Sequence, residues 1–276
     1  MQADSASDRS SRLCKWDWAL VTGGSSGIGR AIAERLAEDG VNLVLVARRA
    51  EKLAEVAAAT QARCNIQTEI ITADLADQSQ RDAVEARLGT EHNAIDMLVN
   101  SAAGGLAGTL IAQSVQQRNY EVELNCVSVL RLSHVAATAM TRRGHGTILN
   151  IASGLGYYPF PGAATYCASK AFVLNLSATL RYELRGTGVG VTVVSPGPTD
   201  TDAAALAGID LTWIPRFLLA PPTQVAELAL AAARGGKAVE QVNRWNAALT
   251  LAHHAPARFS QPLLNRIFRR ATRAAE

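Results

Sequence analysis

The stretch Trp18-Ala-Leu-Val-Thr-Gly-Gly-Ser-Ser-Gly-Ile-Gly29 joins a short apolar run to a cluster of glycines. After the last of these glycines, apolar residues recur at helical spacing as far as Gly40. The apolar run predicts a buried strand, the glycines predict a tight turn, and the spacing predicts a helix. A strand, a glycine turn and a helix in this order indicate the opening unit of an α/β fold.

The alternation of strand and helix continues along the chain to Pro196. Residues 41–47 hardly alternate between apolar and polar, as expected for a strand buried on both faces. Further strands are predicted over 66–73, 97–100, 147–151 and 190–195, and helices over 50–62, 78–89, 114–142, 165–186 and 223–234. Strict alternation with short connections predicts a doubly wound parallel sheet, a Rossmann fold, in a single domain.

The glycine spacing G-x-x-x-G-x-G points to a dinucleotide site. Glycines permit a tight turn and a close backbone approach, so a pyrophosphate can lie against the helix N-terminus. No lysine follows Gly29, which argues against a nucleoside-triphosphate loop. The second strand ends at Ala47-Arg48-Arg49, with two guanidiniums and no acid. This favours a 2′-phosphorylated ribose and predicts NADP(H) over NAD(H), the alternative being a solvated basic loop.

Tyr166 and Lys170 are four residues apart in a predicted helix, so their side chains share one face. A neighbouring ammonium favours the phenolate and lowers the pKa of a tyrosine, which makes the pair a candidate for proton transfer. Such a pair also arises by chance in any helix, so its meaning depends on the rest of the chain.

The motifs, taken together and in order, resemble those of the classical short-chain dehydrogenases/reductases. The family motif T-G-x-x-x-G-I-G is matched by Thr22–Gly29, N-N-A-G by Asn100–Gly104, and P-G-x-x-x-T by Pro196-Gly197 with Thr201. The adenine-contacting acid that follows the third strand in the family is matched by Asp74-Leu75. The catalytic tetrad of the family is matched by Asn125, Ser153, Tyr166 and Lys170. The resemblance covers about residues 16–201.

The resemblance implies a role for each residue of the tetrad. Tyr166 would be the general acid in carbonyl reduction and the base in alcohol oxidation, and Lys170 would lower its pKa and hold the nicotinamide ribose. Ser153 would hydrogen-bond the substrate oxygen, and Asn125 would hold a water in a proton relay. The structural alternatives are a turn cap for Ser153, a polar helix residue for Asn125 and a helix cap for Asp74.

The cofactor contacts follow from the glycine turn, the strand ends and the resemblance. They are expected at Gly23, Ser25, Ser26, Gly27, Ile28, Gly29, Arg48, Arg49, Asp74, Leu75, Asn100, Ala102, Tyr166, Lys170, Pro196, Gly197, Thr199 and Thr201. No metal is expected. The resemblance also implies a homodimer or homotetramer, with a two-fold interface formed by the helices that carry Asn125 and Tyr166.

Two departures from the family pattern matter. Ser101 and Ala103 replace the second Asn and the Gly of N-N-A-G, and the V-D-G-G close of ketoacyl-carrier-protein-reductase-like members gives way to about 40 other residues. The latter resembles the branch that acts on steroid-like and acyl substrates. The apolar residues of 206–219, with Leu155, Tyr157 and Phe160, would line such a pocket, and 198–222 is either a lid or an extra helix pair.

Composition and charge bound the remaining possibilities. The chain of 276 residues divides into a flexible N-terminus (1–15), a catalytic domain (16–235) and a basic C-terminal extension (236–276). Residues 234–276 hold eight Arg and Lys against two Glu. Within them, residues 262–270 are a short helix candidate with apolar and arginine faces, which suits packing on the subunit or an oligomer interface or, as the alternative, a weak membrane-surface contact, whereas nucleic acid is not expected.

Scattered cysteines and no apolar leader predict a cytoplasmic protein. We expect an oxidoreductase that interconverts a carbonyl and an alcohol on a fairly apolar molecule. The alternative is a non-catalytic dinucleotide-binding regulator or scaffold with the same fold.

Overall fold

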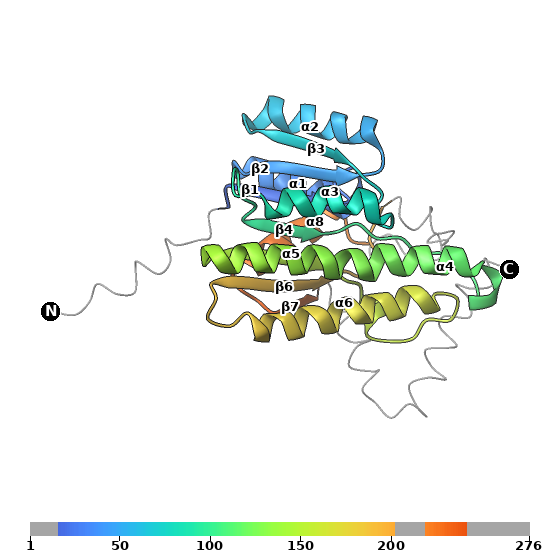
Figure 1. Ribbon diagram of the computed structural model, residues 1–276. Coiled ribbons are helices and arrows are strands. Elements are labelled where there is room, and N and C mark those ends of the chain that lie inside the picture. The colour runs from blue at the N-terminus through green and yellow to red at the C-terminus, as the bar shows by residue number, and fades with distance from the viewer. Residues whose placement is uncertain (1–15, 202–218, 242–276) are drawn as a thin grey trace.

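The computed structural model describes residues 16–201 and 219–241, which form a parallel sheet of seven strands with helices on both faces (Figure 1). The strands are β1 (Trp18–Thr22), β2 (Asn42–Ala47), β3 (Thr68–Thr72), β4 (Met97–Asn100), β5 (Gly146–Ile151), β6 (Val189–Ser195) and β7 (Val239–Gln241). Their order is β3-β2-β1-β4-β5-β6-β7, and every neighbouring pair is parallel. The predicted doubly wound sheet is confirmed.

The helices fill the connections between the strands. They are α1 (Gly27–Glu38), α2 (Ala50–Cys64), α3 (Gln78–Gly89), α4 (Val115–Val122), α5 (Ser128–Arg143), α6 (Ala164–Glu183) and α8 (Pro222–Arg234), with the short 3₁₀ turns η1 (Leu110–Ala112) and η3 (Gly154–Gly156) and the π-helical segment η2 (Glu123–Val127). The single helix predicted over 114–142 is therefore interrupted by a π segment, because the Ser128 N–H bonds to the Glu123 carbonyl five residues back.

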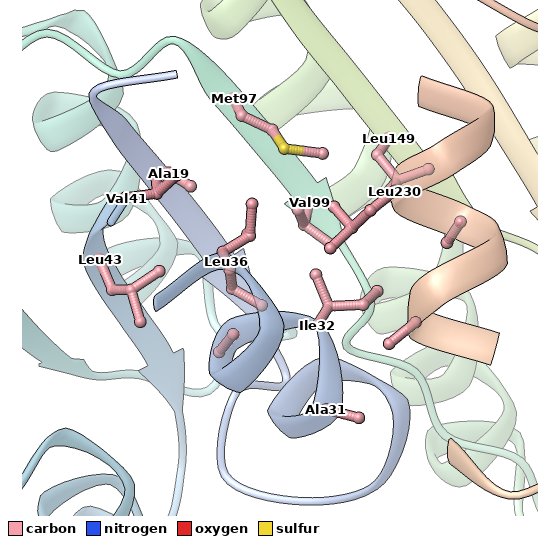
Figure 2. Packing of buried hydrophobic residues seen from close by; sticks show 14 of the residues in the cluster. Ala19, Ala31, Ile32, Leu36, Val41, Leu43, Met97, Val99, Leu149 and Leu230 are labelled. Carbon is pink, nitrogen blue, oxygen red and sulfur yellow. The ribbon is translucent and has the colours of Figure 1, made fainter. Parts of the chain in front are cut away.

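Two apolar layers hold the sheet between its helices. One layer packs α1, α2 and α8 against one face, and Ile32 of α1 and Leu230 of α8 meet Met97 and Val99 of β4 there (Figure 2). The other layer packs α3 and α5 on the opposite face, around Leu20, Leu98 and Leu132. Because β1, β2 and β4 are buried throughout or nearly so, they read in the sequence as apolar runs without alternation.

Sequence reasoning did not find β7. The strand has three residues, and among the described strands it pairs only with β6. Its Val239 is exposed, so the sequence shows no buried apolar run at this position. It lies beyond residue 235, where the catalytic domain was predicted to end. The predicted N-terminal segment 1–15, most of the loop 198–222 and residues 242–276 of the extension lie outside the described residues. In the described part of the chain, no helix is both long enough and apolar enough to cross a membrane.

Candidate active site

The strand order reverses between β1 and β4, and this reversal positions the site. The chain steps from β1 outward to β2 and β3 on one side, and from β4 outward to β5, β6 and β7 on the other. In open α/β sheets the crevice beyond the carboxyl ends of the strands at such a switch point is where ligands bind. The glycine turn after β1 and the Asn100–Gly104 segment after β4 both lie at this edge.

The glycine turn has the geometry that its sequence predicts. Gly23 and Gly27 adopt positive φ values of 69° and 56°, which favour glycine. A Cβ at Gly29 would lie 2.5 Å from the carbonyl oxygen of Gly23, so the turn can close only on a residue without a side chain. The Ser26 side chain does not cap α1, so it leaves the first N–H groups of the helix available at the crevice edge. Ile28 packs against the core cluster.

The two arginines after β2 point to different places. The Arg49 guanidinium donates to the hydroxyls of Ser26 at 2.7 Å and Ser25 at 3.2 Å, beside the glycine turn. Arg48 instead donates to the Tyr120 hydroxyl at 2.7 Å and lies 4.0 Å from the Asp74 carboxylate. The pair therefore spans the end of β2, with one cation at the glycine turn and one toward β3.

The residues at the ends of β3 and β4 are held by side-chain and backbone contacts. The Leu75 side chain is buried in the core, and its carbonyl accepts a hydrogen bond from Arg81. The Asn100 amide donates to Asn150 and Ser133, so its side chain ties β4 to β5 and α5 rather than facing the crevice. The backbone N–H of Ala102 donates to the hydroxyl of Thr22 at 3.0 Å.

Asn125 lies in the π segment, buried to 1% exposure. Its amide accepts from the Gly104 N–H at 3.0 Å, donates to the Gly104 carbonyl at 2.7 Å and donates to the Ser169 hydroxyl at 3.1 Å. A π turn within an α-helix commonly marks a functional position. Here it turns Asn125 so that one side chain joins the segment after β4 to helix α6.

Ser153, Tyr166 and Lys170 come together from the end of β5 and from α6. Ser153 follows β5 and hydrogen-bonds the Tyr166 phenol. The Lys170 ammonium lies 5.6 Å from the centre of the Tyr166 ring and donates to the Ile151 carbonyl at 3.0 Å. The predicted sharing of one helix face by Tyr166 and Lys170 thus corresponds to the observed geometry.

The charges of this pair differ from the expectation. Desolvation by burial raises the pKa of Tyr166 to about 12, against a smaller lowering by the Ser153 hydrogen bond. Burial also lowers the pKa of Lys170 to about 8. The pKa of the phenol is raised and not lowered, because desolvation of the phenolate outweighs the lowering by Ser153. At neutral pH the phenol keeps its proton and Lys170 keeps most of its charge.

A buried ion pair lies close to the tyrosine. Arg118 and Glu121 of α4 are both less than a tenth exposed and lie 3.3 Å apart. Arg118 also donates to the carbonyls of Leu106, Gly108 and Thr109, which fixes the loop after β4. Desolvation raises the pKa of Glu121, and the charge of Glu121 in turn raises the pKa of Tyr166.

The segment after β6 lies next to the glycine turn. A Cβ at Gly27 would lie 3.2 Å from the Thr201 side chain, so Thr201 lies beside the glycine turn. The Thr199 hydroxyl donates to the Gly197 carbonyl, and the Ala220 N–H donates to the Pro198 carbonyl. The second of these hydrogen bonds joins the two described ends of the 198–222 segment.

Three features that shape the site were not predicted from the sequence. Thr22 accepts hydrogen bonds from the Ser101 and Ala102 N–H groups and donates to the Val99 carbonyl, so it fastens the glycine turn to the loop after β4. Its place as the first residue of the glycine motif could have indicated this. Tyr120 and the Arg118–Glu121 pair gave no signal, because polar and aromatic residues scattered on a helix read as a solvated face.

Comparison with known proteins identifies a matching protein family and several proteins of similar sequence. The sequence profile of the family described as short chain dehydrogenase matches residues 17–210. Sulfoacetaldehyde reductase 2 of Chromohalobacter salexigens is 35% identical over 189 residues, which are 67% of this chain and 74% of that protein.

Two solved structures extend the similarity over most of the chain. A short-chain dehydrogenase from Sphingobium yanoikuyae in complex with NADPH is 32% identical, with a TM-score of 0.79 over 90% of this chain and 93% of that one. The bulky-bulky ketone specific alcohol dehydrogenase from Comamonas testosteroni is also 32% identical, with a TM-score of 0.75 over 88% of this chain and 98% of that one.

Proposed function

Because the chain belongs to the short-chain dehydrogenase family, we propose that it is an NADP(H)-dependent oxidoreductase that interconverts a carbonyl and an alcohol on a fairly apolar small molecule. The observation that carries the proposal is the meeting of Ser153, Tyr166 and Lys170 at the switch-point edge of the sheet. Hydride transfer to or from carbon is the chemistry that the nicotinamide supplies when bound.

The residues around the glycine turn fit a dinucleotide. The absence of side chains at Gly23 and Gly29, with the uncapped N-terminus of α1, suits a pyrophosphate. Arg48 and Arg49 offer guanidiniums at the end of β2, where a 2′-phosphate would need a cation and an acid would repel it. The NADPH complex of the Sphingobium relative supports the same reading.

The proton chemistry belongs to Tyr166. With a pKa of about 12 the phenol is protonated at neutral pH and can give its proton to a carbonyl oxygen as that oxygen gains negative charge. Ser153, already hydrogen-bonded to the phenol, is placed to donate to the same oxygen. Lys170 sets a positive charge beside the ring and so stabilises the phenolate that remains. Asn125 is proposed to hold a water that links Lys170 to solvent as a proton relay.

The apolar character of the substrate rests on the residues after Ser153. Leu155, Tyr157 and Phe160 pack with Tyr158 into a small apolar cluster beside the site. The Comamonas relative is named for bulky ketones and the Chromohalobacter relative for sulfoacetaldehyde, so the relatives differ in their carbonyl compounds.

The proposed homo-oligomer is supported by the exposed side chains Leu130 on α5 and Phe172 on α6.

A cofactor titration with a carbonyl panel tests the proposal. Wild type and Arg48→Ala are titrated with NADPH and NADH, and NADPH oxidation is followed with a range of ketones and aldehydes. We expect wild type to bind NADPH more tightly than NADH, Arg48→Ala to lose most of that preference, and at least one apolar carbonyl to be reduced. Equal affinity of wild type for both cofactors would refute the NADP(H) preference. Tight binding without turnover on any carbonyl would favour the non-catalytic alternative.

A further inference from the structure

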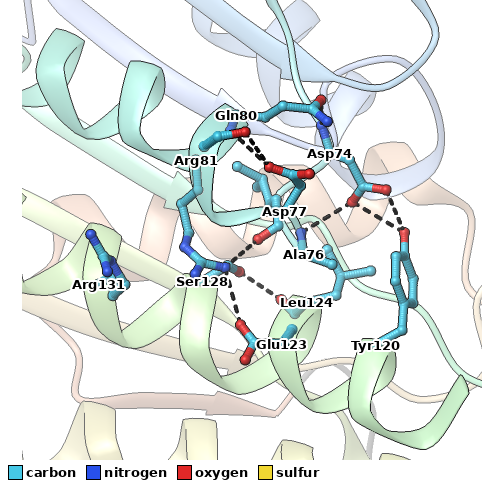
Figure 3. Close-up of polar contacts among 12 residues, drawn as sticks. Asp74, Ala76, Asp77, Gln80, Arg81, Tyr120, Glu123, Leu124, Ser128 and Arg131 are labelled. Atoms are coloured by element: carbon cyan, nitrogen blue, oxygen red, sulfur yellow. Dashed lines mark hydrogen bonds and ion pairs between the residues drawn. The ribbon is translucent and has the colours of Figure 1, made fainter. Parts of the chain in front are cut away.

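Three segments far apart in the sequence meet at the hydroxyl of Tyr120. This hydroxyl accepts a hydrogen bond from the Arg48 guanidinium at 2.7 Å and donates to the Asp74 carboxylate, whose oxygens lie 3.0 and 3.1 Å away. Figure 3 shows the phenol reaching from α4 to that carboxylate. Burial and the Asp74 contact raise the pKa of Tyr120, so the phenol stays protonated and keeps donating at neutral pH.

Asp74 is itself a fixed anchor. Its carboxylate accepts from the Ala76 N–H at 3.1 Å, and its own N–H donates to the Gln80 side chain at 2.8 Å (Figure 3). The loop after β3 is thus held in place independently of Tyr120. The Tyr120 phenol links this fixed carboxylate to Arg48 at the end of β2.

Arg48 has little else to hold it. Its side chain is 62% exposed, and among the described residues only one of its guanidinium nitrogens makes a hydrogen bond, the one to Tyr120. A long arginine side chain in solvent visits many rotamers, and fixing one of them on ligand binding costs entropy. A contact that already fixes the rotamer reduces that cost. The remaining guanidinium N–H groups are left to meet an anion.

We propose that Tyr120 is a positioning residue for cofactor selection, whose hydroxyl holds the Arg48 guanidinium at the adenosine end of the crevice for the 2′-phosphate of NADPH. The inference rests on the proposed NADP(H)-dependent function. Tyr120 acts through Arg48, so its contribution should appear only with a phosphorylated ribose and only when Arg48 is present. If the phenol merely fastened α4 to the loop after β3, its loss would weaken NADPH and NADH equally.

A double-mutant cycle on cofactor binding tests this. Dissociation constants for NADPH and NADH are measured by calorimetry for wild type, Tyr120→Phe, Arg48→Ala and the double variant. We expect Tyr120→Phe to weaken NADPH binding about three- to tenfold, the net worth of one ordinary hydrogen bond, and to leave NADH binding unchanged. In the Arg48→Ala background the same substitution should have no further effect. Tyr182→Phe is the matched control, since Tyr182 is an exposed tyrosine on α6, and it should bind both cofactors like wild type.

Two results would overturn the proposal. One is an unchanged ratio of the NADH and NADPH dissociation constants in Tyr120→Phe, and the other is an equal loss of NADPH affinity with and without Arg48. Either result leaves the proposed function standing as long as wild type binds NADPH in preference to NADH. A wild type without that preference refutes the NADP(H) assignment itself, and this inference falls with it.

Discussion

At Tyr166, the proposed proton donor, two influences on the phenol act in opposite directions. The spacing of Tyr166 and Lys170 predicts a stabilised phenolate, whereas the folded chain surrounds the phenol with protein and a buried carboxylate. Desolvation prevails and raises the pKa of Tyr166 to about 12. At neutral pH the phenol is therefore protonated, which is the state that the proposed role of Tyr166 as proton donor in carbonyl reduction requires.

Glu121 offers a way to test this balance. Its negative charge disfavours the phenolate, so Glu121→Gln should lower the pKa of Tyr166. Alcohol oxidation needs the phenolate, so its rate should rise at lower pH in the variant than in wild type. Carbonyl reduction needs the phenol, so its alkaline decline should also begin at lower pH. The measurement is the pH dependence of kcat/KM in both directions.

The control for this prediction is Glu55→Gln, an exposed glutamate on α2 away from the site. It removes the same charge and should leave both pH profiles unchanged. Profiles of Glu121→Gln that coincide with those of wild type would show that the buried ion pair with Arg118 serves the loop after β4 and not the tyrosine.

At the scale of elements, the turn from β1 into α1 depends on the absence of a side chain at Gly29. The third glycine of the motif lies against backbone, because a Cβ there would come within 2.5 Å of the Gly23 carbonyl oxygen and 3.1 Å of the Thr22 carbonyl oxygen. Backbone cannot move aside as the end of a flexible side chain can. The motif therefore reflects the packing of the helix on the strand as much as the approach of a cofactor.

We predict that Gly29→Ala destabilises the fold by about 1–3 kcal/mol, the usual cost of overpacking, and weakens dinucleotide binding. Gly89→Ala is the matched control, because Gly89 is the exposed last residue of α3 and a Cβ there meets nothing within 4 Å. The control should be as stable as wild type or up to about 1 kcal/mol more stable. Urea unfolding measures both variants, and wild-type stability and cofactor affinity in Gly29→Ala would contradict the packing argument.

The π segment in the long helix that carries Asn125 is a feature that apolar periodicity does not predict. Apolar spacing predicts one helix over 114–142, and helical structure is found there. The π segment at Glu123–Val127 adds a single residue to one turn, which changes the apolar pattern too little to be seen. It is nevertheless this turn that directs the Asn125 amide onto Gly104.

For the whole molecule, most of the architecture was accessible from the sequence. Buried parallel strands read as apolar runs, and strict alternation with helices leaves few topologies, so the parallel sheet followed from pattern. The family motifs also named the residues that meet at the switch point. The short edge strand β7 was not accessible, because its three residues have no apolar signature and need β6 as a partner.

The contacts that tune the site were harder to predict for a different reason. Arg48, Asp74 and Tyr120 come from three separate connections, and nothing in the sequence says that their side chains touch. Likewise, Arg118 and Glu121 have the character of surface residues until the loop after β4 folds over them. Such contacts depend on tertiary packing, which local patterns do not encode.

The most direct test of the central claim follows the hydride and the proton in one assay. Wild type and Tyr166→Phe are incubated with NADPH that carries deuterium at both C4 positions and a panel of apolar ketones and aldehydes, and the alcohols are analysed by mass spectrometry. We predict singly deuterated alcohol from wild type and a rate about 10²- to 10⁴-fold lower from Tyr166→Phe, with NADPH affinity nearly unchanged. Wild-type turnover in Tyr166→Phe, or no deuterated alcohol from any carbonyl despite bound NADPH, would contradict the account.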